Sequence, residues 1–219
     1  MPYFFAQRTG DHVDIVGTDA RHLSRSLRAR PGELVSVVEP AGVLLAVRLE
    51  IVGDELVRGR VESELPHRPE PVVPVTLAVA MLPAGGLELV LSRCTEAGTA
   101  RFVLVDAGRS VARGSKPERW ATICREAAML AGRLVVPPVV GPVPFARAWA
   151  EADRPWLLDR GGEPLGRLRE PSTLFIGPEG GWTPAERAAA GDRVVGLGPR
   201  NLRADTAALV ALALALGPS

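Results

Sequence analysis

Two glycine-rich segments near the C-terminus contain the residues whose types and spacing could do chemistry. The first reads IGPEGGWTPAE, residues 176–186, and the second reads LGPRNLRADTAALVA, residues 197–211. Each follows a short apolar run typical of a buried strand and leads into a run typical of a helix. Glycine lets the backbone come close to a ligand because no side chain intervenes. The two segments are therefore the first candidates for a binding site.

The first segment fits neither of the common phosphate-binding patterns. A P-loop needs G-x-x-x-x-G-K-[ST], and this segment contains no lysine to neutralise a phosphate. The dinucleotide fingerprint G-x-G-x-x-G fails because the glycines are Gly177, Gly180 and Gly181. Glu179 would also repel a phosphate at close range. Two interpretations stay open: ordinary surface loops without a ligand, or two loops that meet at one cleft and hold a neutral or cationic ligand.

The elements that must position these loops alternate between strand and helix. From residue 75 onward, apolar strand-like runs such as TLAVAML, RFVLVDA, WLLD, TLFIG and RVVGLG take turns with helical runs. This alternation indicates a mostly parallel α/β sheet with helices on both faces. Ligands bind such sheets at the carboxyl ends of strands, where both glycine-rich segments lie. A Thr-Pro-x-Glu start is expected for the helix after the first segment, and Asp205 is expected to cap the last helix.

The first part of the chain has a different pattern. Short Val- and Leu-rich runs with turn signals between them favour a small β-barrel. One helical run, DARHLSRSLRAR, has Leu23 and Leu27 on one face, and Asp19 is expected to cap it. The segment LPHRPEPVVPV contains four prolines, which exclude a helix and predict a stiff linker. We place the domains at residues 1–68 and 75–219, with the linker at 66–74.

Composition limits the function classes. The net charge is +1, so RNA or a membrane surface would have to be bound by a local patch. No signal-peptide pattern opens the chain, and the apolar run near its end is shorter than the ~20 residues that span a bilayer. Neither the two cysteines nor the three histidines show metal-ligand spacing. We therefore expect a cytoplasmic protein with no membrane segment and no metal.

Several arginines could meet RNA phosphates. The helical run contains Arg21, Arg25 and Arg28. These arginines would form either an RNA-binding patch or a solvated basic face, and the two interpretations weigh equally. The region up to residue 70 contains nine arginines against eleven acids, so an RNA contact there must be local. Arg93 lies between acids at neighbouring helix turns, and this spacing favours surface ion pairs.

The pair IGPEGGWTPAE and LGPRNLRADTA resembles the bacterial 16S ribosomal RNA (uracil-N3)-methyltransferase family of the SPOUT superfamily. The family pattern reads I-G-P-E-G-G-[FWL]-[ST]-x-x-E and then L-G-x-R-I-L-R-x-E-T-A, so Asn201 and Asp205 are departures in the second motif. HLSRSLRARPGE, SRCTEAGTARF and RWATICREAAMLAGRLVVPPV resemble further family motifs in the right order. Met129-Leu130 replaces the family's Glu-Gln, and LPAGG replaces a loop that commonly contains lysines. The resemblance covers nearly the whole chain.

The resemblance implies an RNA-binding PUA-like β-barrel and a SPOUT-type α/β domain with a deep trefoil knot, although true knots are rare. It implies S-adenosylmethionine as cofactor, a homodimer with the pocket near the subunit interface, and methylation at N3 of a specific uridine in 16S rRNA, as RNA or within the small ribosomal subunit. The alternative is a non-catalytic RNA-binding or ribosome-assembly factor with a degenerate pocket, which the Met129-Leu130 departure and the weak basic character favour.

Under this resemblance Arg203 is the candidate for stabilising the uracil anion or binding an RNA phosphate, and Arg200 is the second catalytic candidate. Glu179 lies either near the sulfonium or in a loop that it fixes. The expected RNA-binding residues are Arg21, Arg25, Arg28 and Arg93. The expected cofactor-binding residues are Leu158, Ile176, Gly177, Pro178, Glu179, Gly180, Gly181, Leu197, Gly198, Asn201 and Leu202.

Overall fold

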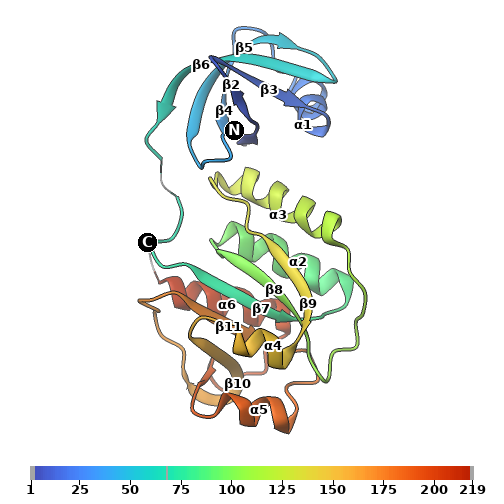
Figure 1. Ribbon diagram of the computed structural model, residues 1–219, viewed down its shortest axis with the longest axis vertical. Helices are drawn as coiled ribbons and strands as arrows, with labels where there is room; N and C mark the ends of the chain where they lie inside the picture. The colour runs from blue at the N-terminus through green and yellow to red at the C-terminus, as the bar shows by residue number, and fades with distance from the viewer. Residues whose placement is uncertain (1–2, 68, 218–219) are drawn as a thin grey trace. The chain divides into compact units, whose positions relative to one another are not determined.

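The structure, a computed structural model, describes residues 3–67 and 69–217 (Figure 1). The chain forms two compact units. The first contains the residues up to Glu70 together with Ala128–Val135, and the second contains Pro71–Ala127 together with the residues from Val136 onward. Each unit buries its own apolar side chains, so each is described by itself.

The first unit is built on a six-stranded sheet in the order β1-β4-β5-β6-β3-β2. Its first pair, β1 with β4, is parallel, and the other pairs are antiparallel. Alternate residues of the long strands, such as Val35 and Val37 or Leu45, Val47 and Leu49, are buried in one core, as a two-residue period dictates. The strands are β1 (Phe4–Phe5), β2 (Arg8–Thr9), β3 (His12–Val16), β4 (Leu34–Val38), β5 (Leu44–Val52) and β6 (Leu56–Leu65).

The helical run of the first unit forms α1 (Thr18–Arg21) and continues as a π-helical turn, η1 (His22–Ser26). The expected cap is wrong, because Gly17 is the N-cap and Asp19 lies inside the first turn. Leu23 is fully buried, whereas Leu27 is exposed. The N–H of Leu27 donates to the carbonyl of His22, five residues earlier, so the wider turn takes Leu27 off the face that Leu23 occupies.

Met129 belongs to the same unit. Its side chain is buried in the core of the first unit, and its carbonyl accepts a hydrogen bond from the N–H of Tyr3 at 3.0 Å. The departure from the family's Glu-Gln at this position therefore has a packing reason, because an apolar side chain here fills a core. Leu130, its neighbour, is exposed.

The second unit is an α/β unit, and the expected parallel sheet is confirmed. Six parallel strands lie in the order β12-β10-β11-β7-β8-β9. The edge strand β9 was not expected, because VVGPVP contains two prolines and proline has no N–H for the ladder; an edge tolerates it. The strands are β7 (Val75–Ala80), β8 (Arg101–Asp106), β9 (Val139–Pro144), β10 (Pro155–Pro164), β11 (Ser172–Ile176) and β12 (Val194–Gly196).

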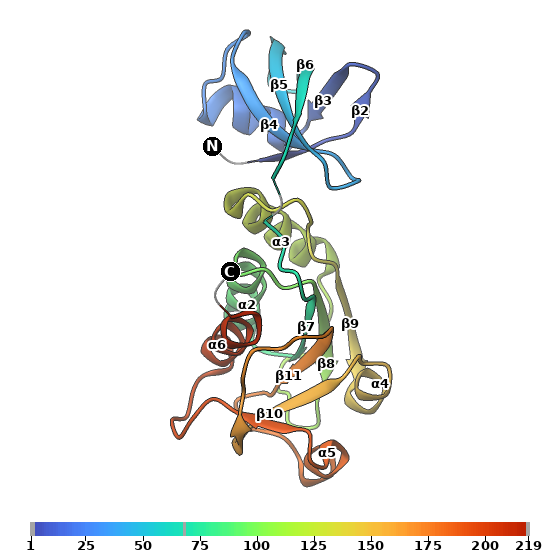
Figure 2. The same cartoon turned by 90° about the vertical axis from the view of Figure 1, so that its left-hand side faces the viewer.

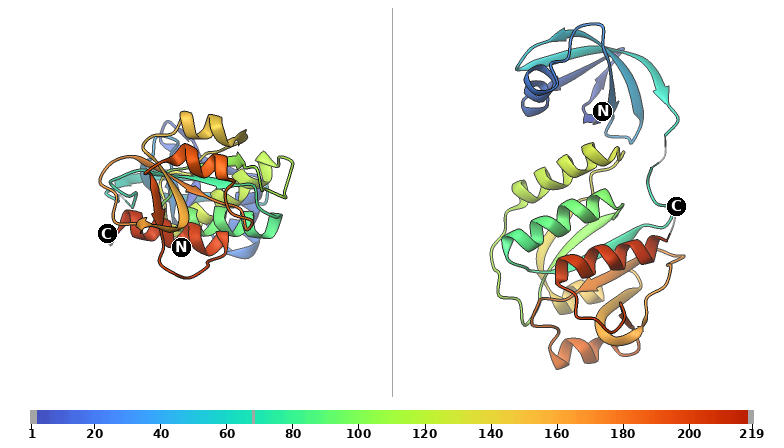
Figure 3. Two further views of the ribbon diagram at one scale, coloured as in Figure 1. Left: turned by 90° about the horizontal axis from the view of Figure 1, so that it is seen from below. Right: turned by 180° about the vertical axis from the view of Figure 1, so that it is seen from behind.

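Helices cover both faces of this sheet, as expected (Figures 1 and 2). On one face α2 and α6 lie side by side (Figure 3), and α4 and α5 lie on the other. Strand β7 faces both layers, since Leu77 and Val79 pack in the cluster with α2 and α6, whereas Ala78 and Ala80 pack in the cluster with Phe145 of α4. The helices are α2 (Ala84–Glu96), α3 (Pro117–Ala131), α4 (Phe145–Ala150), α5 (Pro184–Ala190) and α6 (Ala204–Leu216).

Strand β10 meets β12 twice. Leu157 and Leu158 pair with Val194 and Val195, and after a bulge Glu163 and Pro164 pair with Val195 and Gly196. The chain then continues with Leu165, whose N–H donates to the carbonyl of Gly196 at 3.0 Å. The segment after Leu158 thus bends around β12, the strand that delivers the second glycine-rich loop. No helix of the described residues is long and apolar enough to cross a membrane.

Candidate functional site

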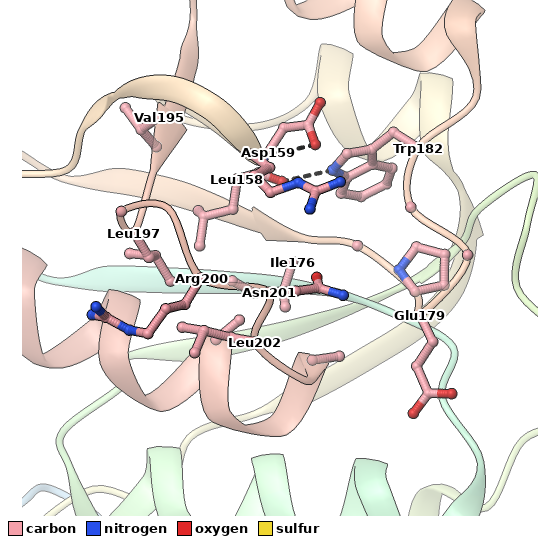
Figure 4. Close-up of a pocket in the computed structure, with 18 residues that line it drawn as sticks. Leu158, Asp159, Ile176, Glu179, Trp182, Val195, Leu197, Arg200, Asn201 and Leu202 are labelled. Atoms are coloured by element: carbon pink, nitrogen blue, oxygen red, sulfur yellow. Dashed lines mark hydrogen bonds between the residues drawn. The ribbon is translucent and has the colours of Figure 1, made fainter.

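A cavity of about 310 Å³ lies where β11 and β12 end, between the two glycine-rich loops and the first stretch of β10 (Figure 4). This size is at the lower end of the roughly 300–1,000 Å³ range of small-molecule sites. The structure brings together around this one cavity all eleven residues that were expected to bind the cofactor: Leu158, Ile176, Gly177, Pro178, Glu179, Gly180, Gly181, Leu197, Gly198, Asn201 and Leu202.

The first glycine-rich loop owes its shape to a tight turn and a helix cap. The N–H of Gly181 donates to the carbonyl of Pro178 at 2.8 Å, and Gly181 has a φ of 69°, which glycine adopts without strain. The expected Thr-Pro-x-Glu start is confirmed: the Thr183 hydroxyl accepts from the N–H of Glu186 at 3.2 Å, and the Glu186 carboxylate accepts from the N–H of Thr183 at 2.8 Å. The loop therefore enters α5 in a fixed geometry.

Trp182 joins the loop to β10. Its indole Nε1–H donates to the carbonyl of Leu158 at 2.9 Å, shown as a dashed line in Figure 4, and its ring is buried. A Cβ on Gly177 would lie 3.0 Å from the indole Cε2, so the ring packs directly on the glycine backbone. Sequence analysis did not select Trp182, although the motif position that admits Phe, Trp or Leu was the available signal.

The second loop turns at Gly198, which has a φ of 90°, and ends at Arg203, the N-cap of α6. The expectation that Asp205 caps α6 is wrong, because Asp205 lies two residues inside the helix and accepts from the N–H of Thr206 at 2.7 Å. Arg200 lines the cavity, but Arg203 does not. The Arg203 side chain is 72% exposed and lies 3.4 Å from the Asp205 carboxylate.

Four charged side chains line the cavity: Asp159, Glu179, Arg160 and Arg200. Asp159 also forms an ion pair with Arg187 of α5, with the Arg187 Nε and the Asp159 Oδ2 2.9 Å apart. Glu179 is exposed, and Figure 4 shows its carboxylate pointing away from the leucines of the cavity. Within residues 3–67 and 69–217 its carboxylate accepts no hydrogen bond, so the turn and the helix cap, rather than Glu179, account for the shape of the loop.

Sequence reasoning missed six lining residues. Asp159 is the last residue of WLLD and Arg160 follows it directly, so neither can be told from an ordinary strand end, and the others are small or apolar. The six are Asp159, Arg160, Trp182, Val195, Ala204 and Ala207.

The arginines expected to bind RNA are mostly paired with acids. Arg21 lies 3.1 Å from Glu55, Arg93 lies 3.2 Å from Glu96, and Arg25 pairs with Asp54. Hydrogen bonds from Arg25 and then Ser24 lower the pKa of Asp54 to about 2, so this pair stays ionised at neutral pH. Arg28 has no ion pair within the described part of the chain. A role of these arginines in RNA binding remains a prediction.

Glu186 links α5 to a second loop, and its loss is expected to destabilise the second unit. One carboxylate oxygen accepts from the N–H of Gly108 at 2.8 Å, and the other accepts from Thr183. The Glu186 side chain is buried, and Glu186→Ala removes its part-buried hydrogen bonds together with one half of the helix cap, so we expect the free energy of unfolding to fall by about 2 kcal/mol.

Urea unfolding measures this effect, with Glu151→Ala as the matched control. Glu151 is exposed and pairs with Arg147 within one helix turn, an interaction worth about 0.5 kcal/mol or less. Equal stability of the two variants would show that the Glu186 hydrogen bonds do not stabilise the unit.

The chain is similar in sequence to known RNA methyltransferases. The RNA methyltransferase domain family matches residues 68–216. The chain is 32% identical to ribosomal RNA small subunit methyltransferase E of Synechocystis sp., over 92% of this chain and 71% of the relative. It is 28% identical to the Bacillus subtilis protein of the same name, over 97% of this chain and 94% of the relative.

A solved structure extends the similarity to the fold. The crystal structure of a ribosomal RNA small subunit methyltransferase E from Neisseria gonorrhoeae bound to S-adenosyl methionine is 29% identical, with a TM-score of 0.89, and the match covers 97% of this chain and 95% of the other. The chain therefore belongs to the RNA methyltransferase family, among the ribosomal RNA small subunit methyltransferases E.

Proposed function

We propose that the protein transfers a methyl group from S-adenosylmethionine to N3 of a specific uridine in the 16S rRNA of the small ribosomal subunit. The observation that carries this proposal is the meeting of the two glycine-rich loops around one cavity at the carboxyl ends of β11 and β12. The relatives named for ribosomal RNA methylation, one of them solved with the same cofactor, support it.

The residues of the cavity fit this cofactor. Apolar side chains, among them Leu158, Leu197 and Leu202, suit an adenine ring and a hydrocarbon chain, and the glycine loops offer backbone N–H and C=O groups. The lining residues include two carboxylates, Asp159 and Glu179, and two arginines, Arg160 and Arg200, so their formal charges balance and a cationic ligand meets no net positive charge.

When bound, S-adenosylmethionine supplies an activated methyl group on a cationic sulfonium. The protein has to align the acceptor nitrogen with that methyl and exclude water, which positioning by the two loops achieves. Uracil N3 is a weak nucleophile while it carries its proton. Arg200, which lines the cavity, is placed to stabilise the negative charge on the uracil oxygens, and the proton can leave to solvent.

The acceptor nitrogen lies on the pairing edge of the base, so the uridine must be unpaired or flipped out to enter the cavity. Arg203, which is exposed outside the cavity lining, suits an RNA phosphate next to that uridine. Arg28 would contribute a further RNA contact, and Arg21, Arg25 and Arg93 would do so by exchanging their acidic partners for phosphates.

We extend the proposal to the finer architecture. Residues 1–68 form a PUA-like β-barrel, 66–74 a linker, and 75–219 a domain with a trefoil knot; the bend of the chain around β12 supports the knot. The protein acts as a cytoplasmic homodimer. From Ala207 onward helix α6 is apolar on all sides. Leu209 and Leu214 are exposed on it, which supports a second copy of the chain as the partner that covers them.

The alternative, a non-catalytic RNA-binding or assembly factor, loses one of its two supports. Met129 is buried in a core of the first unit, so its departure from the family pattern says nothing about the cofactor pocket. The weak overall basic character remains its support.

Two measurements test the proposed function. Calorimetry with the purified protein is expected to show binding of S-adenosylmethionine, and nucleoside mass spectrometry is expected to show N3-methyluridine in 16S rRNA or small subunits taken from a strain that lacks the gene and then treated with the protein and cofactor. Binding without transfer to either substrate would favour the assembly factor. No binding of the cofactor or of its demethylated product would refute the proposal.

A further inference from the structure

A basic loop adjoins the cavity. Residues 107–116, which we call the β8–α3 loop, contain Arg109, Arg113 and Lys116 and no acidic residue. All three basic residues are exposed. The loop follows the carboxyl end of β8, the same edge of the parallel sheet at which the glycine-rich loops lie.

Hydrogen bonds tie the β8–α3 loop to the first glycine-rich loop. Arg109 donates from Nη1 to the carbonyl of Gly180, a cavity residue, at 3.0 Å. The N–H of Gly108 donates to the Glu186 carboxylate at 2.8 Å. A Cβ on Gly180 would lie 3.5 Å from the Cβ of Arg109, in ordinary contact. The basic loop is therefore part of the surroundings of the cavity rather than a separate surface.

The positive charge of this loop is largely available. Arg109 contacts a neutral carbonyl, and among residues 3–67 and 69–217 neither Arg109 nor Lys116 has an ion pair. Arg113 donates to the carbonyls of Ser110 and Ala112, at 2.6 and 2.9 Å, and lies 3.4 Å from the Asp106 carboxylate. The guanidinium groups are thus held by backbone oxygens, which fix their direction and leave most of their charge uncompensated.

The carboxylate on which Lys116 acts, Glu88 of α2, is already occupied by an arginine. Glu88 accepts hydrogen bonds from Arg119 at 2.8 and 3.3 Å, which lower the pKa of Glu88 more than Lys116 does. Arg109 and Lys116 thus differ from the arginines that were expected to bind RNA, most of which pair with a carboxylate.

We propose that the β8–α3 loop binds the phosphate backbone of the RNA whose base enters the cavity. This inference rests on the proposed function. Arginine and lysine are the side chains that bind phosphates, and a nucleotide in the cavity has its own and its neighbours' phosphates within reach of the rim. Arg109 connects the two sites, because the same guanidinium that donates to Gly180 has further N–H groups for a phosphate.

The test removes the three positive charges of the loop. Its effect is compared with the effect of removing three positive charges at the amino ends of the strands, on the other side of the sheet from the cavity. The loop variant is R109A/R113A/K116A. The matched control is R101A/R154A/R169A, since Arg101 begins β8, Arg154 immediately precedes β10 and Arg169 lies shortly before β11; all three are exposed. Binding to unmethylated 16S rRNA made by transcription is measured over a salt series by a filter assay.

For the loop variant we expect the slope of log K against log salt to become shallower by roughly 0.7–0.9 for each phosphate that the variant no longer neutralises. The control should keep the slope of the parent protein. The double variant R113A/K116A retains Arg109 and its bond to Gly180, and it should show about two-thirds of the change if each residue binds one phosphate. An unchanged slope in the loop variant, or an equal change in the control, would overturn the inference.

Two further readouts separate this inference from the proposed function. In methyl transfer, R113A/K116A should raise KM for the RNA and leave kcat and cofactor affinity close to those of the parent protein. If the parent protein methylates the RNA and the loop variants do so with the same KM, the inference fails and the function stands. If the parent protein neither binds the cofactor nor transfers a methyl group, the function itself fails. Weakened binding to small subunits with unchanged binding to RNA would assign the loop to a ribosomal protein instead and refute the inference.

Discussion

Replacing Gly177 by alanine is expected to weaken the binding of S-adenosylmethionine by about 10- to 100-fold, the equivalent of roughly 1.4–2.7 kcal/mol. The new Cβ would lie 3.0 Å from Cε2 and 3.1 Å from Nε1 of Trp182, so the indole or the loop has to give by a few tenths of an ångström. The indole has little room to shift, because its ring packs against Phe145 with centroids 5.3 Å apart and its N–H is held by the carbonyl of Leu158. Either the ring or the loop has to move, and both line or support the cavity.

A double-mutant cycle with Trp182→Phe shows whether this contact is the cause. The smaller ring makes room for the alanine but loses the hydrogen bond from Nε1 to the carbonyl of Leu158, whose length is 2.9 Å. We expect W182F alone to weaken cofactor binding by about tenfold or less, and G177A/W182F to bind more tightly than the sum of the single effects predicts. Calorimetry measures all three variants, with G166A as control, since a Cβ on Gly166 meets nothing within 4 Å.

Two results would contradict this account. Cofactor affinity of G177A equal to that of the parent protein would show that the loop shifts without loss. Strictly additive effects in the cycle would show that Gly177 and Trp182 act on the cofactor separately, through different walls of the cavity.

The features of the fold that depend on local sequence could be predicted. The alternation of apolar strands and helices indicated the parallel sheet with helices on both faces, and the Thr183–Glu186 capping box is a pattern contained within four residues. Asp19 and Asp205 were misplaced as caps because an acid suits any position of a first turn, and which residue is the N-cap depends on where the preceding chain stops being extended. Strand β9 was missed because its prolines are compatible only with an edge, and a sequence does not say which strand is at the edge.

The site also combines residues that local sequence could predict with residues that it could not. Both glycine-rich loops were recognisable from their own residues, whereas Asp159 and Arg160 join them only because β10 is the neighbour of β12, a pairing that has no local signal. The partners of the arginines are equally remote. Arg21 and Arg25 pair with Glu55 and Asp54, which lie 34 and 29 positions further along the chain, so spacing within the helix could not show how far their charge is neutralised.

The place where β10 bends around β12 should be a sensitive point of the second unit. Gly162 lies so close to β12 that a Cβ would fall 2.6 Å from the carbonyl carbon of Val195 and 2.8 Å from its N and Cα. Val195 cannot give way, because it pairs with Leu158 on one side of the bulge and with Glu163 on the other. We therefore expect Gly162→Ala to lower the free energy of unfolding by about 3 kcal/mol, at the upper end of the usual effect of overpacking.

Gly166→Ala is the control within the same segment. Gly166 has open space around it and no left-handed backbone, so alanine there restricts mainly the unfolded chain and should leave stability unchanged or raise it by about 0.4–1 kcal/mol. Urea unfolding of both variants measures the difference, and calorimetry should show that G162A also binds the cofactor less tightly, because Val195 lines the cavity. If G162A unfolds at the same urea concentration as G166A, the bend is loose enough to accept a side chain, and the close contact between the two strands does not hold the second glycine-rich loop in place.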